Sequence, residues 1–315
     1  MKENVQKIAS TLTKLSGDEV LAKDAVEFEG FKYRIGETSG ANIDYMYDLK
    51  DLVNYSHIFI RSLIKDRPIE KVAISIPTEA YYSSKLKEDG GVVQKMKENL
   101  ERNIPTLKSV RVLPQGTSAV SYLVSKELVD PKNGNILVVD GGFNTVNISV
   151  TDETGKILYT NSIHDELGVY NLLTDYFREE LKRKHDEVTT NAQMLKEIFL
   201  KEKIDFGFNS VNITREKEQA LSQFLPKLME RVTRELKKKK IDFDQFVFVG
   251  GISYYISKDA ISSSKTFYLP EENGEFLTLL GMREIVGEDY DVFDVGFGDV
   301  KYDLQVKEIH KDEKS

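Results

Sequence analysis

One local pattern occurs twice in the chain and constrains its fold more than any other feature. Residues 136–150 and residues 291–304 each read as an apolar strand, Asp-x-Gly, a tight turn and an alternating strand. Glycine lets backbone N–H groups approach phosphate oxygens, and aspartate can hold a hydrated Mg²⁺ or a water molecule. Two such hairpins that face each other would therefore form a clamp for phosphate groups.

Length and composition set the class of protein. A chain of 315 residues exceeds what one ordinary core fills, so we expect two domains or one bilobed unit. The apolar content of 40% favours a packed globule, and the net charge of −8 argues against broad binding to nucleic acid. The sequence has no cysteine, which excludes disulfides, thiolate chemistry and Cys-ligated zinc and favours a reducing compartment.

The sequence also carries no sign of membrane insertion or secretion. No run approaches the roughly 20 apolar residues of a membrane span, and residues 1–5 lack the apolar core of a signal peptide. We therefore expect a cytoplasmic protein with no membrane span and no direct contact with nucleic acid. The 4 histidines have no metal-like spacing and are expected in ordinary surface or packing positions.

Strands alternate with helices along the chain, which predicts an α/β fold. Residues 131–134 form the expected crossing between lobes, and the charged, mixed residues 178–218 resemble an inserted subdomain. The other expected elements are a strand at 5–10, a hairpin at 26–36, a helix at 49–65, a strand at 71–77, a helix at 90–102, a strand at 109–114, a helix at 116–128, a strand at 156–163, a helix from 167, a long helix at 220–240, a strand at 245–252 and a helix at 276–286.

Two further motifs accompany the hairpins. Residues 248–252 end a buried strand in a Gly-Gly turn, and residues 112–119 connect a strand to a helix. Together the four motifs resemble those of the actin superfamily of ATPases, specifically the ParM-like plasmid-segregation actins and the archaeal actin-like proteins. In that comparison residues 294–301 match the first phosphate motif, 140–145 the second, and 248–252 the adenosine motif. The resemblance runs in short blocks over nearly the whole chain.

The resemblance implies a bilobed actin-like, ribonuclease H-like α/β fold with a five-stranded sheet in each lobe. Domain I is expected at residues 1–133 plus 273–315. Domain II is expected at residues 134–272 and includes the subdomain at 178–218. Two hairpins from different lobes would then enclose the nucleotide.

The order of the motifs departs from the family, because the hairpin that opens a family member closes this chain. We therefore predict a circular permutation, with the final hairpin at the centre of the first sheet and antiparallel to a strand near residues 5–12. Permutation at an exposed turn costs little when the native ends lie close together. A second departure is Asn147, which stands where the family often has a further Asp. Phe143 and Asn144 also replace a more Gly-rich turn.

The resemblance assigns roles residue by residue. Gln115, Asp294 and Asp140 are the expected catalytic residues, with Gln115 orienting the attacking water and both aspartates holding Mg²⁺ through water. Lys201 and Glu202 are either contacts of the adenine or ribose or part of a solvated helix face. The other expected nucleotide contacts are Gly296, Phe297, Gly298, Asp299, Lys301, Gly141, Gly142, Phe143, Asn144, Gly250, Gly251 and Ile252.

The implied function is Mg²⁺-dependent hydrolysis of ATP or GTP coupled to assembly into filaments. Plasmid or DNA segregation, with a DNA-binding adaptor protein as partner, or another bacterial or archaeal cytoskeletal role would follow. Two alternatives stay open. One is a scaffold that binds nucleotide and barely hydrolyses it. The other is a sugar kinase or a chaperone of the heat-shock-70 type, although no sugar-binding insertion or peptide-binding domain is evident.

Overall fold

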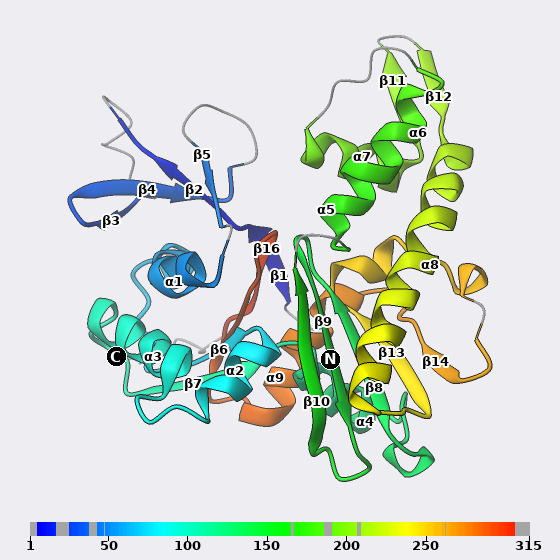
Figure 1. Ribbon diagram of the computed structural model, residues 1–315. Coiled ribbons are helices and arrows are strands. Elements are labelled where there is room, and N and C mark those ends of the chain that lie inside the picture. The colour runs from blue at the N-terminus through cyan, green and yellow to red at the C-terminus, as the bar shows by residue number, and fades with distance from the viewer. Residues whose placement is uncertain are drawn as a thin grey trace, which may run out of the picture.

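Two five-stranded sheets form the centre of the molecule, each with its own helices (Figure 1). The prediction of an α/β fold with one five-stranded sheet in each lobe is confirmed. The structure is a computed structural model that describes residues 5–16, 25–37, 43–46, 48–164, 167–185, 191–206, 209–261 and 263–305.

The first sheet joins strands from the beginning and the end of the chain. Its order is β1 (Gln6–Ala9), β16 (Asp299–Asp303), β15 (Asp291–Val295), β6 (Lys71–Ile76) and β7 (Ser109–Pro114). β16 is antiparallel to both of its neighbours, whereas β15, β6 and β7 run parallel. The final hairpin is therefore central and antiparallel to the N-terminal strand, as predicted. β15 and β6 are almost wholly buried, which suits their apolar runs.

The second sheet repeats this arrangement. Its order is β10 (Ile157–His164), β9 (Thr145–Thr151), β8 (Ile136–Gly141), β13 (Gln245–Val249) and β14 (Thr266–Tyr268). β9 is antiparallel to both neighbours, and β8, β13 and β14 run parallel. The hairpin β8–β9 thus corresponds to β15–β16, and β10 corresponds to β1.

The two sheets differ in the order in which the chain builds them. In the second sheet the hairpin β8–β9 comes before the parallel strands, whereas in the first sheet β15–β16 comes after them. The strand positions are the same in both sheets. Circular permutation relative to the actin family remains a prediction.

Two helices fill the space between the sheets. α4 (Thr117–Ser125) and α9 (Leu277–Val286) pack against each other, and their apolar side chains share a core with residues of both sheets, including Ala73 and Val138. The two helices approach closely at Gly281, where a Cβ would overlap the carbonyl group of Ser118. This shared core ties the two lobes together below the cleft described in the next section.

The remaining helices lie around the two central sheets and beyond the end of the second one (Figure 1). The apolar side chains of the first lobe form one core between α1, α3 and the first sheet, and those of α7 and α8 form another with the second sheet. These helices are α1 (Leu49–Ile64), α2 (Thr78–Ser84), α3 (Gly91–Asn103), α5 (Val169–Asn171), a π-helical turn (Leu172–Phe177), α6 (Arg178–Lys182), α7 (Ala192–Lys201) and α8 (Thr214–Lys239). Short 3₁₀ turns lie at Pro131–Asn133, Gly251–Tyr254, Lys258–Ala260 and Gly274–Phe276.

Two small sheets lie at one end of the molecule, on either side of it in Figure 1. The first-lobe sheet has the order β3-β4-β2-β5, and the second-lobe sheet is the hairpin β11–β12. Their bounds are β3 Val26–Phe28, β4 Phe31–Ile35, β2 Thr11–Lys14, β5 Ile43–Tyr45, β11 Lys203–Phe206 and β12 Asn209–Asn212.

Several elements differ from the sequence-based expectation. The hairpin expected at 26–36 is present but belongs to a larger sheet, because the short strand β2 pairs with β4 and β5 pairs in turn with β2. α2 was not predicted, and α8 begins at Thr214 rather than at residue 220. None of the helices in the described ranges is both long and apolar enough to cross a bilayer. The predicted domain boundaries remain predictions.

Candidate functional site

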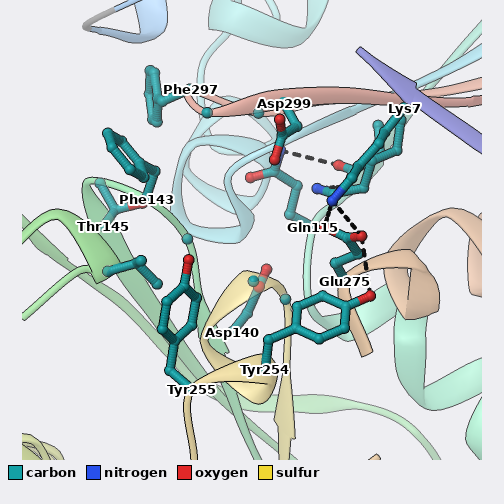
Figure 2. Close-up of a pocket in the computed structure, with 18 of the residues that line it drawn as sticks. Lys7, Gln115, Asp140, Phe143, Thr145, Tyr254, Tyr255, Glu275, Phe297 and Asp299 are labelled. Carbon is teal, nitrogen blue, oxygen red and sulfur yellow. Dashed lines mark hydrogen bonds and ion pairs between the residues drawn. The ribbon is translucent and has the colours of Figure 1, made fainter. Parts of the chain in front are cut away.

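A cleft of about 290 Å³ lies between the two central hairpins (Figure 2). Its walls come from both sheets, from α7 and from the segments after β13 and β14. Of the predicted site residues, those that line it are Gln115, Asp140, Gly142, Phe143, Gly250, Gly251, Asp294, Gly296, Phe297, Gly298, Asp299 and Lys301. The fold therefore brings together, from positions far apart in the sequence, most of the residues that the motifs select.

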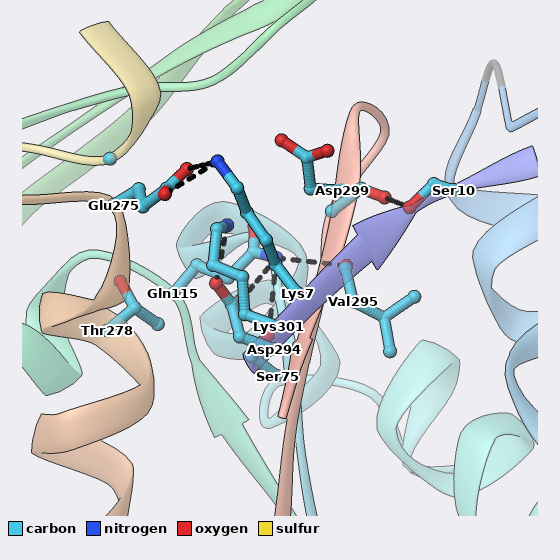
Figure 3. Close-up of polar contacts among 12 residues, drawn as sticks. Lys7, Ser10, Ser75, Gln115, Glu275, Thr278, Asp294, Val295, Asp299 and Lys301 are labelled. Atoms are coloured by element: carbon cyan, nitrogen blue, oxygen red, sulfur yellow. Dashed lines mark hydrogen bonds and ion pairs between the residues drawn. The ribbon is translucent and has the colours of Figure 1, made fainter. Parts of the chain in front are cut away.

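Asp294 is the centre of a buried hydrogen-bond network in the first lobe (Figure 3). Ser75 Oγ donates to Asp294 Oδ1 at 2.5 Å, and Lys301 Nζ donates to Asp294 Oδ2 at 3.0 Å. Gln115 Nε2 lies 3.3 Å from Asp294 Oδ1 and 3.2 Å from the carbonyl oxygen of Val295. The strand register explains this arrangement, because Asp294 and Lys301 are directly paired across the hairpin.

Asp140 holds the corresponding position in the second lobe, where it pairs with Asn147. Burial and, secondarily, the charge of Asp294 raise the pKa of Asp140 to about 7, although Lys301 acts in the opposite direction. Burial alone would lower the pKa of Lys301, but the carboxylates of Asp294 and Asp299 more than offset it and raise that pKa. The neighbouring carboxylates thus keep Lys301 charged, whereas burial favours the protonated form of Asp140.

The turn after β13 closes against Asp140. Gly250 has a φ of +79°, and a Cβ at this position would overlap Asp140 Oδ1. Its N–H donates to the carbonyl oxygen of Gly274 at 3.0 Å. Only glycine fits a left-handed conformation this close to another side chain. The Gly-Gly turn therefore packs directly on the second hairpin and borders the cleft.

The two hairpin turns approach each other at their tips. The Gly142 N–H donates to Thr145 O at 2.8 Å, and the Gly296 N–H donates to Asp299 O at 3.1 Å, which closes each turn. Phe143 packs against Gly298 of the opposite turn, where a Cβ would lie 3.0 Å from Phe143 Cβ. Figure 2 shows Phe143 and Phe297 at the same side of the cleft. Both turns thus present backbone to the cleft at a point where the lobes touch.

Three predicted contacts do not line the cleft, namely Gly141, Asn144 and Ile252. Ile252 is fully buried and packs on Gly141, so these two residues hold the second hairpin against the Gly-Gly turn. Lys201 and Glu202, for which contact with the adenine or ribose was one of two alternatives, are also absent from the lining. Glu202 instead accepts hydrogen bonds from Lys217 and Thr214, and Lys201 pairs with Glu197.

Several residues of the cleft were not predicted. Lys7 Nζ donates to both carboxylate oxygens of Glu275, at 2.7 and 2.8 Å, and Tyr254 Oη donates to the same carboxylate at 3.0 Å. Lys196 of α7 lies 3.5 Å from Asp299 of the opposite lobe. The predicted antiparallel pairing of the N-terminal strand with the final hairpin is the signal that could have found Lys7, because this pairing places Lys7 directly opposite Lys301. The other unpredicted lining residues are Thr145, Asn147, Val169, Leu200 and Tyr255.

The donor set of the cleft fits a hydrated Mg²⁺ with a nucleotide. Asp140 and Asp294 offer two carboxylates, which can accept hydrogen bonds from the water ligands of a hydrated Mg²⁺ that is also bound by phosphate oxygens. Within the described residues no group of three or more His, Cys, Asp or Glu side chains is arranged to hold a metal by itself. The phosphate chain would therefore have to supply part of the coordination.

A family model described as the C-terminal domain of MreB-like archaeal actin homologues matches residues 138–259. This segment contains most of β8, all of β9, β10 and β13, and the Gly-Gly turn. A search of the curated proteins found no match.

Solved structures of actin-like proteins superpose on nearly the whole chain. The archaeal actin homolog Ta0583 in complex with ADP is 17% identical, has a TM-score of 0.65, and covers 88% of this chain and 90% of its own. A 15-stranded ParM filament from Clostridium botulinum is 14% identical and has a TM-score of 0.58. The match covers 88% of this chain and 91% of the ParM chain. MreB5 of Spiroplasma citri bound to ADP is 11% identical and has a TM-score of 0.53. The match covers 82% of this chain and 85% of the MreB5 chain.

The protein therefore has an actin-like fold, and the resemblance to the actin superfamily that the motifs indicate is confirmed. Within that class, the sequence match of the second lobe is to the archaeal MreB-like homologues, and the structural similarity extends to archaeal and ParM-type actins.

Proposed function

We propose that the cleft binds a nucleoside triphosphate, ATP or GTP, with Mg²⁺, and hydrolyses it. The observation that supports this most strongly is the pair of corresponding aspartates, Asp140 and Asp294, which reach one cleft from two facing hairpins. The ADP complexes of Ta0583 and MreB5, which share the fold, are consistent with a nucleotide in this class of cleft.

In this proposal the two hairpins position the phosphates. Lys301 contacts a phosphate oxygen, and the backbone N–H groups of Phe143, Phe297 and Gly298, which line the cleft, donate to others. Asp140 and Asp294 would hold a hydrated Mg²⁺ through its water ligands, and a bound Mg²⁺ would supply positive charge next to the phosphates. The catalytic effect is positioning and electrostatic stabilisation, with little covalent chemistry for the protein.

Gln115 is the residue proposed to orient the attacking water. Its Nε2 is held by Asp294, Ser75 and the Val295 carbonyl, so Oε1 is the atom left to accept a hydrogen from water. A side chain fixed through its amide nitrogen loses little conformational freedom when the water binds. Gln115 is also buried at the end of β7, next to the first hairpin.

We further propose that nucleotide binding gates assembly of the chain into filaments. Head-to-tail contacts between copies are heterologous and propagate into open polymers, and one fold relative is itself a filament. A role in plasmid or DNA segregation through an adaptor protein, or another cytoskeletal role in the cytoplasm, follows from the family resemblance. The alternatives are a non-polymerising scaffold, a kinase or a chaperone with the same fold.

Sedimentation with and without ATP, GTP and Mg²⁺ tests the assembly proposal. We expect pelleting above a critical concentration only with nucleotide and Mg²⁺, and filaments by negative stain. Lys71→Ala is a suitable control, because Lys71 pairs with Asp289 on the surface and lies outside the cleft. A protein that binds nucleotide but stays monomeric over a wide range of salt would favour the scaffold or kinase function.

A further inference from the structure

Lys7 extends the charged row of the first hairpin onto a third strand. It lies on β1 directly opposite Lys301 of β16, and Lys301 lies opposite Asp294 of β15. Side chains of directly paired residues in antiparallel strands project from the same face of a sheet. All three residues line the cleft, so Lys7 adds a second ammonium group to the row that ends at Asp294.

The corresponding row of the second sheet is composed differently. Asp140 pairs with Asn147, and Asn147 pairs with Ser162, whose Oγ donates to Asn147 Oδ1 at 2.7 Å. These partners of Asp140 are uncharged, whereas Asp294 is followed by two lysines. The cationic groups available to a phosphate chain on these two rows therefore both belong to the first lobe.

The partner of Lys7 is fixed while Lys7 itself is accessible. The Glu275 side chain is 6% exposed and is held by Tyr254 as well as by Lys7, whose own side chain is 38% exposed. Figures 2 and 3 show Lys7 reaching across the cleft toward Glu275. An anion that enters the cleft can thus approach the Lys7 ammonium, while Glu275 stays in place.

We infer that Lys7 is a second phosphate-binding lysine, which exchanges its ion pair with Glu275 for an oxygen of the α- or β-phosphate when the nucleotide binds. The inference rests on the proposed nucleotide-binding function. The choice of phosphate follows from position: Lys7 lies between Lys301 and Tyr254, and Tyr254 follows the Gly-Gly turn at the predicted adenosine end.

A purely structural ion pair predicts a different behaviour. If Lys7 and Glu275 only held β1 against the turn at Gly274–Phe276, removing either charge would loosen the cleft and weaken nucleotide binding in the same direction. If Glu275 competes with phosphate for Lys7, removing the Glu275 charge strengthens binding and removing the Lys7 charge weakens it. The two halves of one ion pair then have effects of opposite sign.

Calorimetric titration of the full chain with adenosine, ADP and ATP in the presence of Mg²⁺ separates these accounts, with GDP and GTP as parallel probes. Lys7→Met should weaken ADP and ATP binding by similar factors, roughly tenfold to a hundredfold, as expected for the loss of a charged hydrogen bond. Adenosine binding should be unchanged, and Lys7→Arg should restore most of the affinity. Glu275→Gln should bind ADP more tightly than the wild type. Lys71→Met is the matched control, since its side chain is 42% exposed and paired outside the cleft.

Each outcome separates the inference from the function on which it rests. A wild-type protein that binds none of these nucleotides overturns the proposed function. A wild-type protein that binds ADP no more tightly than Lys7→Met, or a Glu275→Gln variant that binds more weakly than the wild type, overturns only the role of Lys7. If Lys7→Met fails to fold, the Glu275→Gln titration alone decides, because its predicted sign is opposite to that of a structural pair.

Discussion

Asp140 and Asp294 occupy the same position in the two five-stranded sheets, each on the central strand and one pair before the turn of its hairpin. They differ in what faces them. Asp294 is opposite Lys301 and receives three hydrogen bonds, whereas Asp140 is opposite Asn147. Asp294 is therefore ion-paired with Lys301, whereas the residue opposite Asp140 is uncharged.

The first prediction concerns the pH dependence of stability in the absence of Mg²⁺ and nucleotide. The pKa of Asp140 is raised from 3.8 to about 7, mainly by burial. Below pH 3.8 both the folded and the unfolded chain carry the proton. Between pH 3.8 and about pH 7, Asp140 is ionised in the unfolded chain but still protonated in the folded chain. The free energy of unfolding therefore falls as pH rises through this range, by at most about 1.4 kcal/mol per pH unit.

The Asp140→Asn variant does not titrate at this position and therefore lacks this loss. Its advantage over the wild type in free energy of unfolding should grow between pH 5 and pH 7 and then level off. Urea unfolding of both proteins at pH 5 and pH 8 measures it. An advantage of the same size at both pH values would refute the raised pKa. Added Mg²⁺ with nucleotide should reduce the difference, because it stabilises the ionised form in the wild type.

The second prediction concerns hydrolysis. Gln115→Ala should slow single-turnover hydrolysis by one or more orders of magnitude, because the water-orienting group is lost. Nucleotide affinity should change little, and any filaments should persist longer. The rate of hydrolysis of bound ATP is measured by quench-flow or by manual quenching. An unchanged rate would remove Gln115 from the catalytic role and leave it as a structural partner of Asp294.

The third prediction concerns the circular permutation. A reordered chain, with residues 305 and 5 joined by a short linker and the chain opened between Gly287 and Glu288, should fold and bind ATP. The reason is that β1 and β16 are already neighbours, with Gln6 paired to Tyr302, so the linker spans a short gap. Deletion of residues 288–315 should instead give an insoluble or nucleotide-blind protein, because the fully buried strand β15 and its partner β16 are lost from the first sheet.

Thermal unfolding and ATP titration of both chains provide the test. A truncated chain that folds and binds ATP normally would mean that the final hairpin is an appendage. A reordered chain that fails to fold, beside a stable wild type, would mean that the family's strand order is incompatible with this sequence.

The sequence predicts the parts of the site that are local. Each Asp-x-Gly hairpin brings its strand, turn and aspartate together within about fifteen residues, so both hairpins and the Gly-Gly turn could be identified from spacing. The short strands β2 and β5 could not, because three or four residues carry too little periodicity.

The polar contacts that cross the cleft could not be predicted in the same way. Lys7 and Glu275 are 268 residues apart, and neither belongs to a motif. Lys196 of α7 lines the cleft, whereas Lys201 at the end of the same helix pairs with Glu197, as the solvated-face alternative expects. Such contacts depend on how distant segments of the chain are placed, and this is a property of the tertiary fold.

The most direct test of this account is the Mg²⁺-dependent binding of ATP to the wild type and to Asp294→Ala, with Lys71→Ala as control. Calorimetry should show saturable one-to-one binding for the wild type and the control. Binding should be lost or strongly weakened in the variant, with near-UV circular dichroism confirming that the variant is folded. Equal, Mg²⁺-independent affinity in all three proteins, or no binding to the wild type, would contradict the assignment of this cleft as a nucleotide site.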